Sequence, residues 1–232
     1  MSDVWAALLL ATLAGGSIPL GAWIATFNAA WPNWLKTEAR HGVIAFGAGA
    51  LLAAVALVLV PEGTERLGAG AALGWFFAGG VAFAVIDRAL SRAGGKFAQF
   101  LAMMMDYLPE AMALGTLISG DLGTALLVAG LIALQNLPEG FNAMRELSED
   151  GPAPLWLFVL MVPLGPLAAW VGVSLPPTQE GVIGAVMMLA SGGILFLMFQ
   201  DIAPQVPLKN AHLPTLGAVC GFGLGLAGDL LI

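Results

Sequence analysis

Residues 122–146 read LGTALLVAGLIALQNLPEGFNAMRE, an apolar run that ends in charged residues. At about 1.5 Å per residue, a helix of this length crosses the roughly 30 Å hydrocarbon core of a bilayer. A polar segment, Gln135-Asn136-Leu137-Pro138-Glu139, interrupts the run in its second half. We therefore predict a membrane-spanning helix that carries a carboxylate and two amides inside the bilayer.

The rest of the chain is similarly apolar. Hydrophobic residues make up 59% of the 232 residues and charged residues only 10%, whereas soluble domains carry about 25% charged residues. Eight stretches are long enough to span a membrane. They cover 4–27, 41–61, 68–90, 97–119, 122–146, 155–175, 180–204 and 212–232. We predict an all-α integral membrane protein with eight transmembrane helices in the lipid bilayer, forming a single domain over residues 1–232.

The basic residues predict how the spans are oriented. Loops on the cytoplasmic side are enriched in Lys and Arg, and seven of the eight such residues lie in alternate loops when eight spans are counted. The seven are Lys36, Arg40, Arg88, Arg92, Lys96, Arg145 and Lys209. Only Arg66 lies on the other side. We expect a multi-pass protein of the cell inner (plasma) membrane with both termini outside.

A second polar segment repeats the pattern one span earlier. Asp106-Tyr107-Leu108-Pro109-Glu110 and residues 135–139 both place an oxygen-bearing side chain four positions before a glutamate that follows a proline. Residues four apart share one face of a helix. A charge at the bilayer centre costs at least about 2.5 kcal/mol, so two matched segments indicate a function. The alternative is structural, with carboxylates that are protonated or paired with polar neighbours.

The oxygen atoms of these segments suit a divalent cation. Hard and borderline divalent ions bind carboxylate and amide oxygens, and the spans 97–119 and 122–146 are joined by a loop short enough to form a hairpin. We expect a metal site between them. Its predicted ligands are Asp106, Glu110, Gln135, Asn136 and Glu139. Pro109 and Pro138 each lack a backbone donor, so we expect them to kink the helices and free carbonyl oxygens.

The two segments resemble the ZIP (Zrt-, Irt-like) family of metal transporters, in a divergent prokaryotic form. Gln135-Asn136-Leu137-Pro138-Glu139-Gly140 is similar to the family's His-Asn-x-Pro-Glu-Gly segment, and residues 106–111 are similar to the matching segment one helix earlier. Further similarities lie at Val60-Pro61-Glu62-Gly63, Pro163-Leu164-Gly165 and residues 191–205.

This resemblance implies eight spans with both ends outside and no prosthetic group. It implies transport of zinc, manganese, iron or cadmium into the cytoplasm through a site between the fourth and fifth spans. It also implies that the first, fourth, fifth and sixth spans form one bundle that moves against the other helices.

The chain departs from the family at several ligand positions. Asp106 and Gln135 stand where the family has histidines. Tyr107 replaces an asparagine and Val162 replaces a glutamate, so we expect the family's second metal position to be closed and one main site to remain. A set of oxygen ligands without histidine shifts preference from zinc toward Mn²⁺, Mg²⁺ or Fe²⁺.

Other functions and partners remain open alternatives. With so many ligands replaced, a chain of this fold could carry another substrate or act as a regulator. We expect no enzyme activity, because Asp106 and Glu110 lie on one helix and no hydrolase or nucleotide-binding motif is present. The sequence has no basic tail or patch of the kind that binds nucleic acids, so we expect no nucleic-acid partner. A homodimer is conceivable, because the glycine-rich last span suits close packing either within the monomer or between copies.

Overall fold

The computed structural model describes residues 3–27, 38–93, 95–118, 120–148, 154–176, 178–206 and 212–232, without the side chains of residues 93, 95–103, 106, 146 and 213. The regular structure of these ranges is all helical. In chain order the elements are α1 Asp3–Ala25, α2 Arg40–Ala53, η3 Ala54–Leu59, α3 Val60–Glu65, α4 Ala69–Ala93, α5 Gly95–Ile118, α6 Leu122–Leu147, α7 Trp156–Val159, α8 Leu164–Val173, α9 Glu180–Leu197, η4 Met198–Ile202, η5 Ala203–Gln205 and α10 Leu213–Leu231.

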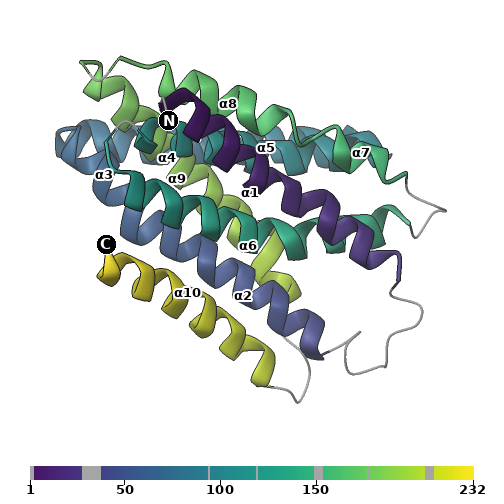
Figure 1. Cartoon of the computed structure of the whole chain (residues 1–232). Helices are drawn as coiled ribbons and strands as arrows, with labels where there is room; N and C mark the ends of the chain where they lie inside the picture. The colour runs from purple at the N-terminus through teal and green to yellow at the C-terminus, as the bar shows by residue number, and fades with distance from the viewer. Residues whose placement is uncertain are drawn as a thin grey trace.

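These elements form eight helical rods in the described part of the chain, and each rod covers one predicted span (Figure 1). Seven of the rods are long and apolar enough to cross a membrane. The eighth, α5, is not among those seven, and it is the helix that carries Asp106 and Glu110. Large apolar side chains such as Leu13, Phe77 and Val81 are exposed on the outer faces, as lipid contact requires. The chain is therefore a multi-pass helical membrane protein.

Prolines explain where three of the rods change geometry. The ring of a proline collides with the carbonyl four residues earlier in an α-helix. For Pro61 and Pro204 that carbonyl lies in the wide turns η3 and η4, and for Pro163 it belongs to the last residue of α7. Pro109 and Pro138 instead lie inside α5 and α6, which each remain one continuous helix. The predicted kinks at these two prolines therefore do not break either helix.

Glycines bring four pairs of helices into close contact. In each pair, a Cβ added to a glycine on either helix would overlap a carbonyl oxygen of the other. The pairs are α1 with α6 (Gly21, Gly140), α5 with α8 (Gly115, Gly172), α4 with α9 (Gly79, Gly192) and α2 with α10 (Gly49, Gly217, Gly221). Small residues at such crossings are typical of membrane helices. The glycine-rich last helix thus packs within the monomer, as one of the two predicted alternatives has it.

The glycine pairs belong to two groups of helices. Helices α1 and α5 contact each other, and both contact α6 and α8. Helices α2, α3, α4, α9 and α10 pack mainly among themselves. The groups meet where α2, η3 and α10 contact α6 and where α5 contacts α4 and α9. Figure 1 shows α6 lying between α1 and α2. The first, fourth, fifth and sixth spans thus contact one another in the structure, while their role as a transport bundle and its movement stay predictions.

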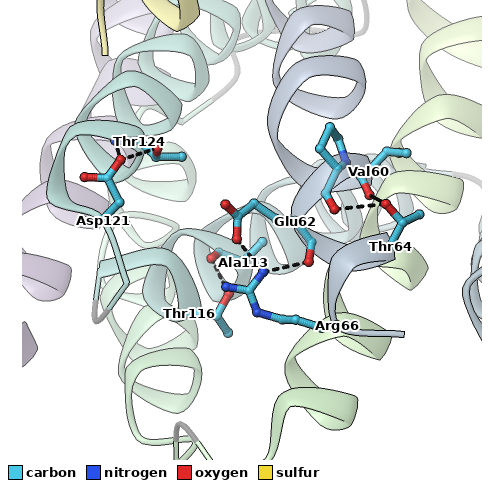
Figure 2. A network of polar contacts seen from close by, with 9 residues as sticks. Val60, Glu62, Thr64, Arg66, Ala113, Thr116, Asp121 and Thr124 are labelled. Carbon is cyan, nitrogen blue, oxygen red and sulfur yellow. Dashed lines mark hydrogen bonds and ion pairs between the residues drawn. The ribbon is translucent and has the colours of Figure 1, made fainter. Parts of the chain in front are cut away.

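Polar contacts stabilise the helix ends at the predicted outer side (Figure 2). Asp121 precedes α6 and accepts hydrogen bonds from the backbone N–H groups of Gly123 and Thr124 and from the Thr124 hydroxyl. These hydrogen bonds hold the pKa of Asp121 below its ordinary value, and the bond from the Thr124 hydroxyl contributes most. Arg66, the one basic residue predicted on this side, forms an ion pair with Glu62 one turn earlier.

Candidate functional site

The centre of the site is a contact between α5 and α6. Gln135 Nε2 donates a hydrogen bond of 3.0 Å to Glu110 Oε2 and a second of 2.6 Å to Asn136 Oδ1. Glu110 and Gln135 are each 2% exposed, and Asn136 is fully buried. The structure therefore brings together three of the five predicted ligands.

The acceptor oxygen of Gln135 is the distinctive atom of this cluster. Its Nε2 donors are occupied, but Oε1 is buried and has no hydrogen-bond partner in the described part of the chain. A buried polar atom without a partner costs about 1–3 kcal/mol, and such atoms in native proteins often mark an absent ion or water. This oxygen lies on the same side chain that contacts Glu110, so it is suited to bind a cation next to that carboxylate.

Helix α1 forms a further wall of the site. Asn136 Nδ2 donates 3.2 Å to the carbonyl oxygen of Ala14, and the Ser17 hydroxyl donates 2.6 Å to the same oxygen. Asn136 is thereby held against α1, while its Oδ1 accepts from Gln135. Ser17 is itself buried. The amide of Asn136 is thus oriented by two helices, which fixes the position of its oxygen.

The two remaining predicted ligands lie one turn away on the same helices. Glu139 is on α6, four residues after Gln135, and its side chain is partly buried. Asp106 lies in α5, four residues before Glu110, but its side chain is outside the described residues. Their helical positions agree with the prediction, and their contribution to a metal site stays a prediction.

Tyr107 fills the space that separates α5 from α1 and α8. It is 1% exposed, and its hydroxyl donates 3.1 Å to the carbonyl oxygen of Ala11. A Cβ added to Gly15 or to Gly165 would overlap the tyrosine hydroxyl, so this ring occupies the volume that larger residues would take. Val162 lies in the turn before α8. The position of Tyr107 is consistent with the predicted closure of a second metal position.

The ligand set is poor in the usual metal-binding residues. The described side chains include no group of three or more His, Cys, Asp and Glu that could hold a metal ion. The side-chain oxygen atoms that the structure brings together belong to the amides of Gln135 and Asn136 and to the Glu110 carboxylate. Such oxygen atoms suit hard ions better than they suit zinc.

A second polar contact lies toward the predicted inner side. Arg40 Nε donates 2.9 Å to Asn142 Oδ1, which joins the start of α2 to the last part of α6. Both residues line a cavity of about 220 Å³ whose other walls come from α1, α2 and α6. Leu137 and Pro138, from the second polar segment, form part of those walls. The cavity therefore reaches the helix that carries the site.

Some of these features were not predicted from the sequence. The carbonyl of Ala14 carries no sequence signal, because any residue has one. The charge of Arg40 predicts the orientation of the chain but not its contact with Asn142. Asn142 follows Gln135 and Glu139 at intervals of seven and three residues. That spacing would have placed Asn142 on the same face of α6.

Comparisons with known proteins found no relative of this chain. No protein-family model matches the chain, and no match was found among curated proteins.

Proposed function

We propose that this protein is a ZIP-type transporter that carries divalent metal ions into the cytoplasm through the site between α5 and α6. The observation that carries the proposal is the buried cluster of Glu110, Gln135 and Asn136, in which Gln135 Oε1 has no partner among the described residues. Ionisable residues inside a membrane protein are costly and commonly mark an ion pathway. A bound divalent cation would satisfy both the carboxylate and the amide oxygen.

The proposed site contains one main metal position. Glu110, Gln135 and Asn136 would bind the ion, and Asp106 and Glu139 would complete its oxygen ligands. The ring of Tyr107, packed against Gly15 and Gly165, supports the absence of a second position. These ligands offer oxygen donors and no imidazole nitrogen or thiolate sulfur, so we expect Mn²⁺, Mg²⁺ or Fe²⁺ to compete well with Zn²⁺.

The packing of the helices supports a moving group. Buried hydrogen bonds join α5 to α6, α6 to α1 and α5 to α1, and reciprocal glycines join α1 to α6 and α5 to α8. The whole site therefore belongs to one group of four helices. Displacement of this group against α2, α4, α9 and α10 would carry a bound ion across the membrane without separating its ligands. In this proposal the protein lies in the cell inner membrane, and both of its termini face the outside.

Uptake by purified protein in proteoliposomes tests the proposal. We expect radioactive Mn²⁺ to accumulate, and we expect unlabelled Zn²⁺ to compete no more than a few-fold better than Mn²⁺ at neutral pH. Asp106→His should shift the competition toward Zn²⁺, because zinc favours imidazole ligands. Many-fold preference for Zn²⁺ in the unaltered protein would refute the selectivity, and the absence of uptake of any divalent ion would refute transport.

A second candidate function is metal-dependent regulation without transport. The observation that favours it is the replacement of residues that the ZIP family uses as metal ligands, by Asp106, Tyr107, Gln135 and Val162 in this chain. Binding of Mn²⁺ measured by calorimetry, without uptake in the same vesicles, would support this candidate over transport.

A further inference from the structure

Three polar side chains form a stripe along α6 toward the predicted inner side. Gln135, Glu139 and Asn142 are separated by four and three residues, so they lie on one face of the helix. Gln135 and Asn142 are buried, and Glu139 is partly buried. The stripe thus continues from the proposed ion site with side-chain oxygens spaced by single turns.

Arg40 stands at the inner end of this stripe. Its Nε–H donates to Asn142 Oδ1 at 2.9 Å, from the first residue of α2. This bond connects the two groups of helices, whereas the hydrogen bonds that Tyr107 and Asn136 donate to α1 stay within one group. A displacement of one group against the other must therefore stretch or break the Arg40–Asn142 bond.

A cavity lies beside this bond, because Arg40 and Asn142 are both among its lining residues. Its volume of about 220 Å³ is several times the ~30 Å³ that one water molecule occupies in the liquid, so it has room for several water molecules. Leu137 and Pro138 line it at one side, and Arg40 and Asn142 are its polar lining residues. Leu137 and Pro138 follow Asn136 on α6, so the cavity borders the segment of α6 that carries the proposed site.

We propose that Arg40 is the inner gate of the transport route, an inference that rests on the proposed function. An arginine side chain stays charged in proteins and repels a divalent cation where the effective dielectric constant is low. In the state described, Arg40 also occupies the oxygen of Asn142. When the two groups of helices shift and the bond breaks, the charge leaves the cavity and Asn142 Oδ1 becomes free to bind the departing ion.

Thiol labelling tests the gate without any transported ion. In a Cys220→Ser background, Leu137→Cys places one thiol on the cavity wall, and a water-soluble cationic reagent is added from the inner side. We expect Arg40→Gln to raise the labelling rate about tenfold, the change that follows loss of a hydrogen bond to a charged group. Arg40→Lys keeps the charge but lacks the Nε donor, so its labelling rate should rise above that of the parent and stay below that of Arg40→Gln. Arg88→Gln removes a charge from an exposed position on α4 and should also leave the rate unchanged.

Uptake of Mn²⁺ by the same variants links the gate to transport. Arg40→Gln should speed initial uptake, and Arg88→Gln should not. If Arg40→Gln does not give a folded, monodisperse protein, Asn142→Ala breaks the same bond from the other helix and should also raise the labelling rate.

The outcomes separate the two proposals. Equal labelling of the parent and of folded variants that lack the bond would overturn the gate. Increased labelling with unchanged Mn²⁺ uptake would also overturn it, because the cavity would then lie off the ion route. If no divalent ion is taken up by the parent while labelling still increases tenfold, the proposed function fails and the closing of the cavity by Arg40 is upheld.

Discussion

Replacing Glu110 with glutamine distinguishes a metal-binding carboxylate from a structural one. Glutamine keeps the size of the side chain, which is 2% exposed and accepts a hydrogen bond from Gln135. The charge is removed, and with it the cost of at least about 2.5 kcal/mol for a charge at the bilayer centre. We therefore expect the metal-free variant to be more stable by about 2 kcal/mol, which corresponds to a melting temperature higher by roughly 4–8 °C for a chain of this size.

The same change should weaken cation binding. A divalent ion bound at Glu110 must at least compensate the cost of the buried charge, and about 2.5 kcal/mol corresponds to roughly 50- to 100-fold in affinity. We expect Mn²⁺ uptake by Glu110→Gln to fall by at least this factor at low ion concentration. Stability and activity should thus change in opposite directions, as is common where a site stores unfavourable energy for function.

The assay combines thermal unfolding in detergent, with and without Mn²⁺, and uptake in proteoliposomes. Mn²⁺ should raise the melting temperature of the parent and not that of Glu110→Gln. Glu180→Gln is the control, because Glu180 is exposed in the first turn of α9 and its loss should change stability by no more than about 1 kcal/mol. A Glu110→Gln protein that melts below the parent and transports at the parental rate would refute the reasoning and leave the carboxylate a structural role.

Three other predictions concern packing and the helix ends. Gly140→Ala should destabilise the protein by about 1–3 kcal/mol, because the new Cβ overlaps the Ile18 carbonyl oxygen. The control is Gly130→Ala on the same helix, where an added Cβ meets nothing within 4 Å and the change should be neutral or stabilising by up to about 1 kcal/mol. Equal melting temperatures of the two variants would contradict the packing. Tyr107→Phe should cost about 1 kcal/mol and Tyr107→Ala about 3–5 kcal/mol in thermal unfolding, and similar losses would show that the ring fills no essential space. Because the pKa of Asp121 is lowered in the folded protein, the ionised side chain should stabilise the fold fully above the ordinary Asp pKa range, and this effect should be lost as the pH falls through the lowered pKa. Asp121→Asn should flatten this acid dependence of the melting temperature. Melting temperatures that fall equally with pH in both proteins would contradict this prediction.

The positions of the helices were predictable because they depend on local composition. The bilayer needs about 20 apolar residues in a row, and each of the eight predicted stretches contains a helical rod in the described part of the chain. What the composition could not predict is geometry within a rod. Pro163 separates α7 from α8, while Pro109 and Pro138 stay inside continuous helices. The effect of a proline depends on whether neighbouring helices accommodate the freed carbonyl, and that is a tertiary property.

The site was predictable where its residues repeat a pattern and unpredictable where partners come from distant helices. The four-residue spacings of Asp106 with Glu110 and of Gln135 with Glu139 predicted one polar face on each of two adjacent spans, and a hydrogen bond joins Glu110 to Gln135 across them. The carbonyl of Ala14 lies 122 residues from Asn136 in the chain, and Arg40 lies 102 residues from Asn142. Such pairings depend on how α1 and α2 pack against α6, which short-range periodicity does not encode.

The two kinds of helix contact have consequences for how an ion could be carried. Within the α1, α5, α6 and α8 group, glycines on both helices of a pair admit the facing backbone, so sliding one helix past the other would bring Cα atoms and carbonyls into collision. Between the groups, α2 meets α6 at Gly47, where an added Cβ would lie 3.1 Å from the ring of Pro138 and 3.4 Å from the Cα of Gln135, a one-sided contact that is looser than the glycine pairs. Shear between packed helices proceeds by small sliding displacements, and the one-sided contact resists this less. We therefore expect displacement to concentrate between α2 and α6, which leaves Glu110 and Gln135 together and makes the Arg40–Asn142 bond the contact that must yield.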